Sequence, residues 1–337
     1  MLLLPQLSIG QFSNKWLLSL GLIAGLTLSG CNNAQSNQTA VSVDPKTTEA
    51  TSTNTLSIGY QKYGVLTLLK ARGTLEKQLK ADNVQVKWVE FPAGPQLLEG
   101  LNVGSINFGE VGEAPPIFAQ AANPDVRYFA NQNPGPKGEA LIVRSDSAIR
   151  HFSDLKGKRI ALNKGSNVHY LLLKLLEKHN LSLKDINPVY LPPADARAAF
   201  EKGAVDAWVI WDPFLAAAQE QLQARILDDG EGVVHNRQFY ITDRKFAEQH
   251  PEVLAKLETV LDETSRWAQT NSEAAAAILE KPTGLSNTIL KKSISRKGSG
   301  VSLVTPSVLQ DQQVIANAFY QQKLIPKEIQ VKDALIK

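Results

Sequence analysis

The sequence predicts an α/β protein built from two successive series of alternating strands and helices, and three observations support this. From Thr55 onward, short runs rich in β-branched and aromatic residues alternate with stretches of helical periodicity. A Pro- and Gly-rich break at Asn131–Gly138 divides the alternation in two. The stretch Gly203–Phe214 has the composition of a buried strand followed directly by a helix start. Because repeated β-α-β units imply parallel strands, each series predicts a parallel-rich sheet flanked by helices.

The first series predicts four strands with helices between them. The expected strands are Thr55–Gln61, Val84–Phe91, Ser105–Val111 and Val126–Ala130. The expected helices are Val65–Leu79, Gly94–Val103 and one opened by Gly112–Pro116, where the prolines suit a first turn.

The second series continues the same alternation. Its expected strands are Ala140–Arg144, Arg159–Asn163, Val189–Leu191, Ala204–Trp211 and Arg225–Leu227. Its expected helices are Ser166–His179, Ala194–Lys202 and one from Asp212, a suitable N-cap, to about Leu222. Phe239–Thr242 should return the chain to the first series, and helices are expected at Pro251–Thr270, Glu273–Glu280 and Pro306–Gln321.

The first 54 residues are expected to lie outside the fold. Residues 1–30 have the apolar run of a signal peptide, which ends in Leu28-Ser29-Gly30-Cys31. This pattern resembles the lipobox of bacterial lipoproteins, and Cys31 is the only cysteine of the sequence, so we expect Cys31 to be lipidated. Residues 31–54 are polar and free of aromatic side chains, which is typical of a flexible tether.

Charge and size limit the classes of function. The formal net charge is only +3, and no basic run of the kind found in nucleic-acid-binding proteins occurs. No second apolar stretch approaches membrane-spanning length, so contact with a membrane is expected through the lipid anchor only. The remaining chain, about 280 residues, suits two domains or one large one.

Three strand–helix junctions carry polar groups where a ligand cleft would need them. They are Gln61–Gly64, Gly112–Glu113 and Lys164–Asn167. The carboxyl edges of open α/β sheets bind ligands, and the N–H groups of helix N-termini favour anions. Together these junctions could hold an anion without any Arg or Lys, with Gln61, Gly112, Ser166 and Asn167 as the expected contacts.

Two further side chains are candidates for the same cleft. His169 lies on the first turn of the helix that Ser166 opens. Trp208 and Trp211 should point to opposite faces of their strand, and Trp211, at the carboxyl end, is expected to form a cleft wall. The spacing of the histidines shows no metal site, and no nucleophile–base or cofactor motif is present, so neither catalysis nor a cofactor is expected.

Several stretches resemble the aliphatic sulfonate-binding proteins of ABC importers. They are Ile58–Gln61, Trp88–Gln96, Leu101–Ser105, Pro115–Ala121, Pro193–Phe200 and Gly203–Phe214. The likeness runs from about Leu56 to the C-terminus and is densest up to Phe214. It departs from the family at Asn167 and Val168, where hydroxyl residues are common in relatives.

The resemblance implies a bilobal type II periplasmic-binding-protein fold that closes on its ligand. Residues 55–135 and 240–337 would form lobe 1 and residues 136–239 lobe 2, with a hinge near Asn131–Glu139 and Asn236–Tyr240. It also implies a periplasmic location, a membrane permease and a cytoplasmic ATPase as partners, and a monomer that captures sulfonates.

The ligand stays open at this point. A sulfonate needs hydrogen-bond donors, and a facing carboxylate would repel it, so Glu113 and Asp212 should cap their own helices or meet a cationic group of the ligand. The second option would favour taurine, whose ammonium could pair with one of them. Another small anion is a further alternative. An enzyme on the same fold would need a reactive side chain, for which only His169 is available.

Overall fold

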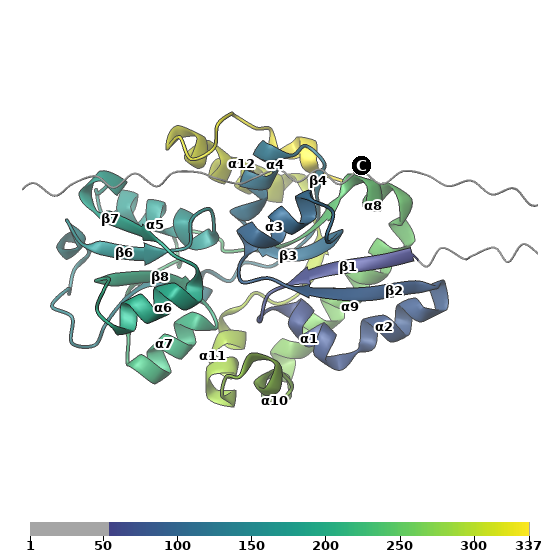
Figure 1. The fold of residues 1–337 in the computed structure, drawn as a ribbon, viewed down its shortest axis with the longest axis horizontal. Helices are drawn as coiled ribbons and strands as arrows, with labels where there is room; N and C mark the ends of the chain where they lie inside the picture. Colours follow the sequence, from purple (N-terminus) through teal and green to yellow (C-terminus); the bar gives the residue numbers. More distant parts are fainter. Residues whose placement is uncertain (1–53, 337) are drawn as a thin grey trace, which may run out of the picture. The chain divides into compact units, whose positions relative to one another are not determined.

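In the computed structural model, which describes residues 54–336, the alternating elements form two β-sheets, each flanked by helices (Figure 1). Among these residues the first sheet has six strands in the order β11-β4-β10-β3-β1-β2. They are β1 (Asn54–Tyr60), β2 (Val84–Glu90), β3 (Phe108–Gly112), β4 (Val126–Gln132), β10 (Gln238–Asp243) and β11 (Val301–Leu303). The second sheet has five strands in the order β7-β6-β8-β5-β9. They are β5 (Glu139–Val143), β6 (Arg159–Leu162), β7 (Asn187–Tyr190), β8 (Ala207–Trp211) and β9 (Arg225–Asp229).

The two helix-flanked sheets are confirmed, but their strands are mixed in direction where the sequence predicted mostly parallel ones. In the described residues β1 is parallel to β2 and β3, and β6 is parallel to β7 and β8. The other pairings are antiparallel. The reason is that β10 returns from the second sheet and enters between β3 and β4, while β5 enters the second sheet from the first. A strand pattern shows composition and not direction, so these two crossings could not be read as antiparallel.

Most helices follow the predicted order. Those between or after the strands of the first sheet are α1 (Val65–Arg72), α2 (Thr74–Leu79), α3 (Gly94–Asn102), α4 (Pro115–Ala122), α8 (Arg244–Gln249) and α9 (Pro251–Thr270). Those of the second sheet are α5 (Asn167–Lys178), α6 (Pro193–Glu201) and α7 (Phe214–Leu222). The C-terminal helices are α10 (Ser272–Thr283), α11 (Asn287–Arg296) and α12 (Pro306–Gln321). Short 3-10 turns lie at Lys80–Asp82, Pro136–Gly138, Phe152–Leu155, Leu183–Asp185 and Val331–Ala334.

The structure corrects two predicted helices and adds elements that were not predicted. The single helix predicted over Val65–Leu79 is two helices, because Gly73 has φ +60° and its N–H caps α1. Helix α7 begins at Phe214 instead of Pro213, yet Asp212 still caps it, since its carboxylate accepts the N–H of Ala216. Helices α8 and α11 and strand β11 were not predicted.

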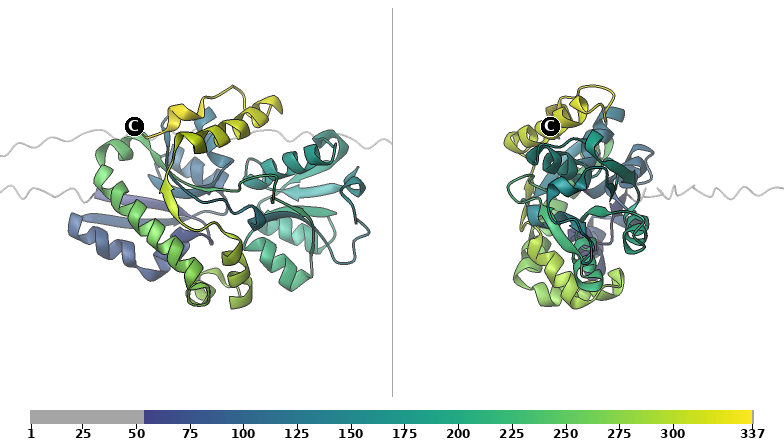
Figure 2. Two further views of the ribbon diagram at one scale, coloured as in Figure 1. Left: turned by 180° about the vertical axis from the view of Figure 1, so that it is seen from behind. Right: turned by 90° about the vertical axis from the view of Figure 1, so that its left-hand side faces the viewer.

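Strand β8, which comes from the stretch Gly203–Phe214, lies at the centre of the second sheet. All of β8 is buried, and the ring of Trp208 packs against Phe200 of α6 with centroids 5.8 Å apart. In the first sheet, apolar residues of α9 pack against β1, and Figure 2 shows this long helix from behind.

The C-terminal helices contact the helices of both sheets. Ile289 of α11 packs on Ala216 and Ala217 of α7. Phe319 of α12 lies 4.8 Å from the ring of Phe118 on α4 and 5.8 Å from that of His169 on α5. The C-terminal segment therefore lies along both halves. The expected signal peptide, tether and Cys31 lie outside the described residues.

Candidate functional site

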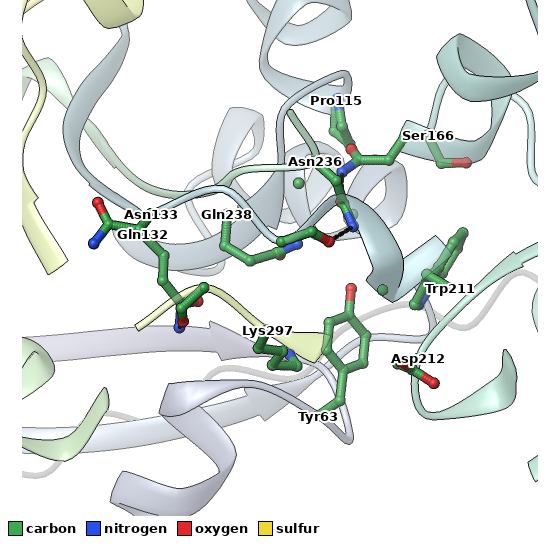
Figure 3. A pocket seen from close by; sticks show the side chains of 16 residues that line it. Tyr63, Pro115, Gln132, Asn133, Ser166, Trp211, Asp212, Asn236, Gln238 and Lys297 are labelled. Carbon is green, nitrogen blue, oxygen red and sulfur yellow. Dashed lines mark hydrogen bonds between the residues drawn. The ribbon is translucent and has the colours of Figure 1, made fainter. Parts of the chain in front are cut away.

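A small cavity lies where strands and helices of both sheets converge, and its volume is ≈ 40 Å³ (Figure 3). Its polar lining comes from Gln132, Asn133, Ser166, Asn167, Asn236 and Gln238. Tyr63 and Trp211 supply aromatic walls, and Asp212 and Lys297 supply charges. Of the residues predicted from the sequence, the structure brings five to this cavity: Gly112, Ser166, Asn167, Trp211 and Asp212. It places Gln61, Glu113 and His169 outside the lining.

Asn167 connects three segments around the cavity. Its side-chain oxygen accepts the backbone N–H of Ala114 at 3.1 Å, and its Nδ2 donates to Asn236 Oδ1 at 2.8 Å. A Cβ atom on Gly112 would lie 2.1 Å from Asn167 Oδ1, so position 112 must be glycine for this side chain to fit. The other N–H of the Asn167 amide has no partner within residues 54–336, and it is a donor at the cavity.

Ser166 lies at the N-cap position of α5, as predicted, but its hydroxyl does not cap the helix. The hydroxyl donates to the carbonyl of Asn163 at 2.7 Å. Because that single proton is used, Ser166 offers the cavity a hydroxyl oxygen in place of the expected donor. The first N–H groups of α5 still lack intrahelical acceptors and face the start of the helix.

Trp211 and Tyr63 form the aromatic part of the lining. Their ring centroids are 6.5 Å apart, and the indole N–H of Trp211 is buried without a partner in the described residues. Gln61 holds Tyr63 in place instead of lining the cavity. Its Oε1 accepts the Tyr63 hydroxyl at 2.9 Å, and its Nε2 donates to the carbonyl of Glu110 at 3.2 Å. Gln61 is therefore a positioning residue in this structure.

Lys297 corrects the expectation that the site would lack Arg and Lys. It follows α11, and its Nζ lies 4.6 Å from the ring centroid of Tyr63. Burial lowers the pKa of Lys297, while the nearby carboxyls of Glu110 and Asp212 act in the opposite direction. Sequence analysis missed it because this part of the chain carries no strand–helix junction; the glycines at 298 and 300 beside a basic pair were its only signal.

The carboxylate of Asp212 already forms hydrogen bonds within the protein. Its Oδ1 accepts the N–H of Ala216 at 2.9 Å, and Arg296 Nη1 lies 3.4 Å from both carboxylate oxygens. Burial raises the pKa of Asp212, and the charge of Arg296 opposes that rise. The prediction that Asp212 caps its own helix agrees with this geometry.

Glu113 neither caps its own helix nor faces the cavity, so that prediction was wrong. Its Oε2 accepts the backbone N–H of Arg237 at 3.0 Å, and it lines a separate hollow that also contains His235 and Asp311. The helix start that it was expected to cap is held by Asn167 through Ala114. Burial raises the pKa of Glu113 to about 7, although the N–H groups of Arg237 and Asn236 counteract this.

His169 is fully buried and plays a structural part. Its Nδ1 accepts the N–H of Gly165 at 3.2 Å, and its ring packs 5.6 Å from that of Tyr190. Burial lowers its pKa to about 4, with Lys164 adding to the effect, so the imidazole is neutral at neutral pH. It orders the turn that precedes α5.

Two further buried carboxyl groups, those of Glu139 and Glu110, lie close to the cavity but outside its lining. Glu139 is 0% exposed, pairs directly with Trp211 across the β5–β8 ladder, and has no partner for either oxygen among the described residues. Burial raises the pKa of Glu139 well above its usual value, and Glu113 adds to this. Burial also raises the pKa of Glu110. A raised pKa favours the neutral form of a carboxyl, which does not repel an anion.

Four polar lining residues were not predicted. Gln132 ends β4 and Asn133 follows it, while Asn236 precedes β10 and Gln238 begins it, so all four lie where the chain passes between the sheets. The sequence shows the signal, since amides cluster at both crossings, but we assigned these segments to a hinge alone. Within residues 54–336, no three His, Cys, Asp or Glu side chains are grouped so as to hold a metal ion. No helix of this part of the chain combines the length and apolar character needed to cross a membrane.

Comparison with known proteins gives a consistent family. Residues 62–275 match the family described as NMT1/THI5 like. An aliphatic sulfonates-binding protein of Escherichia coli (strain K12) is 40% identical over 83% of this chain and 88% of its own length. The alkanesulfonate-binding protein SsuA from Xanthomonas axonopodis pv. citri bound to MOPS has a similar structure, with a TM-score of 0.80 and 41% identity over 83% of this chain and 97% of that one. The periplasmic aliphatic sulphonate binding protein SsuA from Escherichia coli gives a TM-score of 0.77 and 39% identity over 84% and 97%.

Proposed function

This chain belongs to the NMT1/THI5-like family and to the aliphatic sulfonate-binding proteins, and we propose that it captures aliphatic sulfonates for an ABC importer. The observation that carries the proposal is the lining of the cavity between the sheets. It combines polar amide side chains, among them the remaining N–H of Asn167, and one lysine with two aromatic walls. A sulfonate is a monoanion that accepts hydrogen bonds and donates none at neutral pH, so donors and an apolar wall match its two ends.

In the bound state the sulfonate oxygens would accept hydrogen bonds from Asn167, from the N–H groups at the start of α5 and from Lys297. The indole N–H of Trp211 is a further donor, because it is buried and has no partner in the described residues. A buried donor of this kind gains most from an acceptor supplied by the ligand. The carbon next to the sulfonate would lie against Trp211 and Tyr63.

We infer that capture involves closure of two lobes. Lobe 1 would comprise residues 55–135 and 240–337, and lobe 2 residues 136–239, with the hinge near Asn131–Glu139 and Asn236–Tyr240. Support comes from the two crossings between the sheets, at residues 133–138 and 230–237, and from a lining drawn from both sheets. A ligand that bridges both sheets would favour the closed arrangement.

Taurine is a poorer match than a simple alkanesulfonate. The ammonium of taurine needs a free carboxylate, and Asp212 is already engaged by Arg296 and Ala216. Glu113 faces another hollow. A thermal-shift screen of methanesulfonate, longer alkanesulfonates, taurine, sulfate and nitrate tests the proposal, since a bound ligand raises the melting temperature by mass action. The alkanesulfonates should raise the melting temperature most. If no alkanesulfonate raises it, the proposal is contradicted.

We also propose that the protein binds its ligand without converting it. It would do so as a periplasmic monomer that is anchored through lipidated Cys31 and works with a membrane permease and an ATPase. The relatives are binding proteins, and this supports binding without conversion of the ligand. An enzyme would need a reactive group in the cavity, and among the described residues Lys297 is the one basic side chain there. Recovery of the bound ligand chemically unchanged after prolonged incubation would separate the two functions.

A further inference from the structure

One carboxylate in the lining of the cavity would oppose an anionic ligand. Asp212 is 4% exposed, and it lines the same cavity as Lys297. Its position is fixed, because its backbone N–H donates to the carbonyl of Gly138 at 2.8 Å and its Oδ1 accepts the N–H of Ala216 at 2.9 Å. Like charges repel strongly where water is largely excluded, so an ionised Asp212 without a compensating charge would weaken the binding of a sulfonate.

Arg296 supplies the compensating charge from outside the cavity. It ends α11, and its Nη1 lies 3.4 Å from both carboxylate oxygens of Asp212. Its Nη2 donates to Gln219 Oε1 on α7 at 2.5 Å. The side chain of Arg296 is 15% exposed, so solvent and salt screen this pair weakly. Arg296 does not line the cavity, and it therefore compensates Asp212 without occupying the space that a ligand would take.

Contacts between α11 and α7 keep Arg296 beside Asp212. Ile289 of α11 packs on α7, which is the helix that Asp212 caps. Lys292 of α11 also forms an ion pair with Glu220 of α7, with the charged atoms 2.7 Å apart. The position of the guanidinium thus follows from the packing of two helices and does not depend on a bound ligand.

Removing the guanidinium would change what the cavity can bind. The charge beside the cavity would fall by one unit, and of the two cations that act on Asp212 only Lys297 would remain. A sulfonate would then meet a carboxylate that is no longer compensated, whereas an ammonium on the same ligand would find a partner in it. Because the cavity has a volume of only ≈ 40 Å³, an ammonium two carbons from the sulfonate would stay near Asp212.

We propose that Arg296 is a specificity-determining residue: by compensating Asp212, it makes the cavity accept simple alkanesulfonates and disfavour sulfonates that carry an ammonium near the head group. The inference rests on the proposed function, because a sulfonate must first occupy the cavity. It adds to that function that one residue outside the cavity sets the charge class of the ligand, a monoanion against a zwitterion.

Three variants separate the charge of Arg296 from its structural contacts. Arg296→Gln removes the guanidinium. Asp212→Asn combined with Arg296→Gln removes both charges, and the asparagine oxygen can still accept the N–H of Ala216. Arg237→Gln is the matched control, because Arg237 also lies 3.4 Å from a carboxylate, that of Asp311, and its side chain is also 15% exposed. Arg237 does not line the cavity.

The probes are ethanesulfonate and taurine, which is ethanesulfonate with an ammonium on its second carbon. Calorimetry at about pH 8 favours the ionised form of Asp212, because burial raises its pKa and loss of Arg296 removes the charge that opposes this rise. In the unmodified protein ethanesulfonate should bind at least about tenfold more tightly than taurine, because the compensated carboxylate offers no partner to the ammonium.

Arg296→Gln should shift the ratio of the two dissociation constants by at least about tenfold towards taurine. The double variant should restore the preference for ethanesulfonate, which a purely structural role of Arg296 would not explain. Arg237→Gln should leave the ratio within about twofold of its original value. The ratio is the quantity to compare, because a loss of folded protein reduces the binding of both probes alike.

Three results would overturn this role of Arg296: an unchanged ratio in Arg296→Gln, the same shift in Arg237→Gln, or a double variant that keeps the shifted ratio. Tighter binding of taurine than of ethanesulfonate by the unmodified protein would also overturn it. In each of these cases a sulfonate still binds, and sulfonate capture stands. Failure of both probes to bind the unmodified protein would instead refute the proposed function itself.

Discussion

Asn167 accepts a hydrogen bond from the backbone N–H of Ala114 at 3.1 Å, and this contact joins the first turn of α5 in one half to the start of α4 in the other. The same side chain donates to Asn236, which lies in the segment that leads back into the first sheet. Gly112 leaves the space that this side chain needs. One amide therefore ties together the three parts of the chain that meet at the cavity.

Replacing Asn167 by alanine should weaken methanesulfonate binding by about ten- to a hundredfold. The reason is the loss of a donor to a charged group, worth roughly 1.5–3 kcal/mol, together with the loss of the link between the halves. Ser166→Ala is the matched comparison, because the Ser166 hydroxyl already donates to Asn163. It should change the dissociation constant by less than about threefold in calorimetry. Equal losses for the two variants would show that Asn167 has no special part in binding.

Lys297→Met should lower the affinity for alkanesulfonates by a similar ten- to a hundredfold. Lys297 lies beside Tyr63 in the cavity lining, and methionine keeps its apolar stem while removing the charge. Lys327→Met, at an exposed position away from the cavity, controls for the change in net charge. If both variants bind as the unmodified protein does, Lys297 is not a contact of the anion.

Glu113 should make the protein less stable as the pH rises from about 4.5 to about 7. Its pKa in the folded protein is raised to about 7 from 4.5, so its favourable contribution is complete below the lower value and is lost on passing the upper one. Its surroundings contain Arg237, Asp311, Tyr170 and Glu139, which can modify the size of the effect. A shift of this size corresponds to roughly 3 kcal/mol.

The test compares Glu113→Gln with the unmodified protein by urea unfolding across this pH range. Glutamine keeps an acceptor for the N–H of Arg237 but does not ionise. The free energies of unfolding should agree near pH 4.5 and differ by up to about 3 kcal/mol in favour of the variant at pH 8. His169, whose pKa is lowered to about 4, acts in both proteins and cancels in the difference. A constant difference at all pH values would contradict this account.

Cys31→Ser should release the protein from the membrane or leave its signal peptide uncleaved. The prediction rests on the Leu28-Ser29-Gly30-Cys31 pattern, because a lipid can be attached to the thiol of Cys31 and not to serine. Fractionation of cells that express each form would show the difference. A mature variant that stays with the membrane would exclude Cys31 as the anchor.

The sequence predicted the second half of the fold better than its binding site. Trp208 and Trp211 were assigned to opposite faces of a strand, and the structure buries one against Phe200 and places the other at the cavity. That inference needed only the alternation of side chains along β8. The amides of Asn236 and Gln238 were missed because they reach the cavity through chain crossings, whose geometry has no local period. Lys297 was missed for the same reason. It follows helix α11, about 85 residues after Asp212 in the sequence, and the fold brings the two side chains to the same cavity.

Of the two carboxylates that were predicted to cap their own helices, one does so and the other does not. Asp212 caps its helix as local sequence suggested, because the acceptor and the N–H of Ala216 are close in sequence. Glu113 was assigned to the helix that follows it, yet its partner is the N–H of Arg237, which lies far away in sequence. A local rule identified the cap at Asp212, but local rules cannot show which distant backbone group will compete for a carboxylate.

The most direct test of the central claim is calorimetry of the unmodified protein with propanesulfonate and with phosphate at neutral pH. The sulfonate accepts hydrogen bonds only, and the lining offers donors from Asn167 and Lys297. Phosphate is partly a dianion at neutral pH, so it costs more to desolvate than a sulfonate monoanion, and Lys297 is the one basic side chain in the lining that the structure describes. Propanesulfonate should therefore bind about ten- to a hundredfold more tightly than phosphate. Equal affinities, or tighter binding of phosphate, would contradict the account.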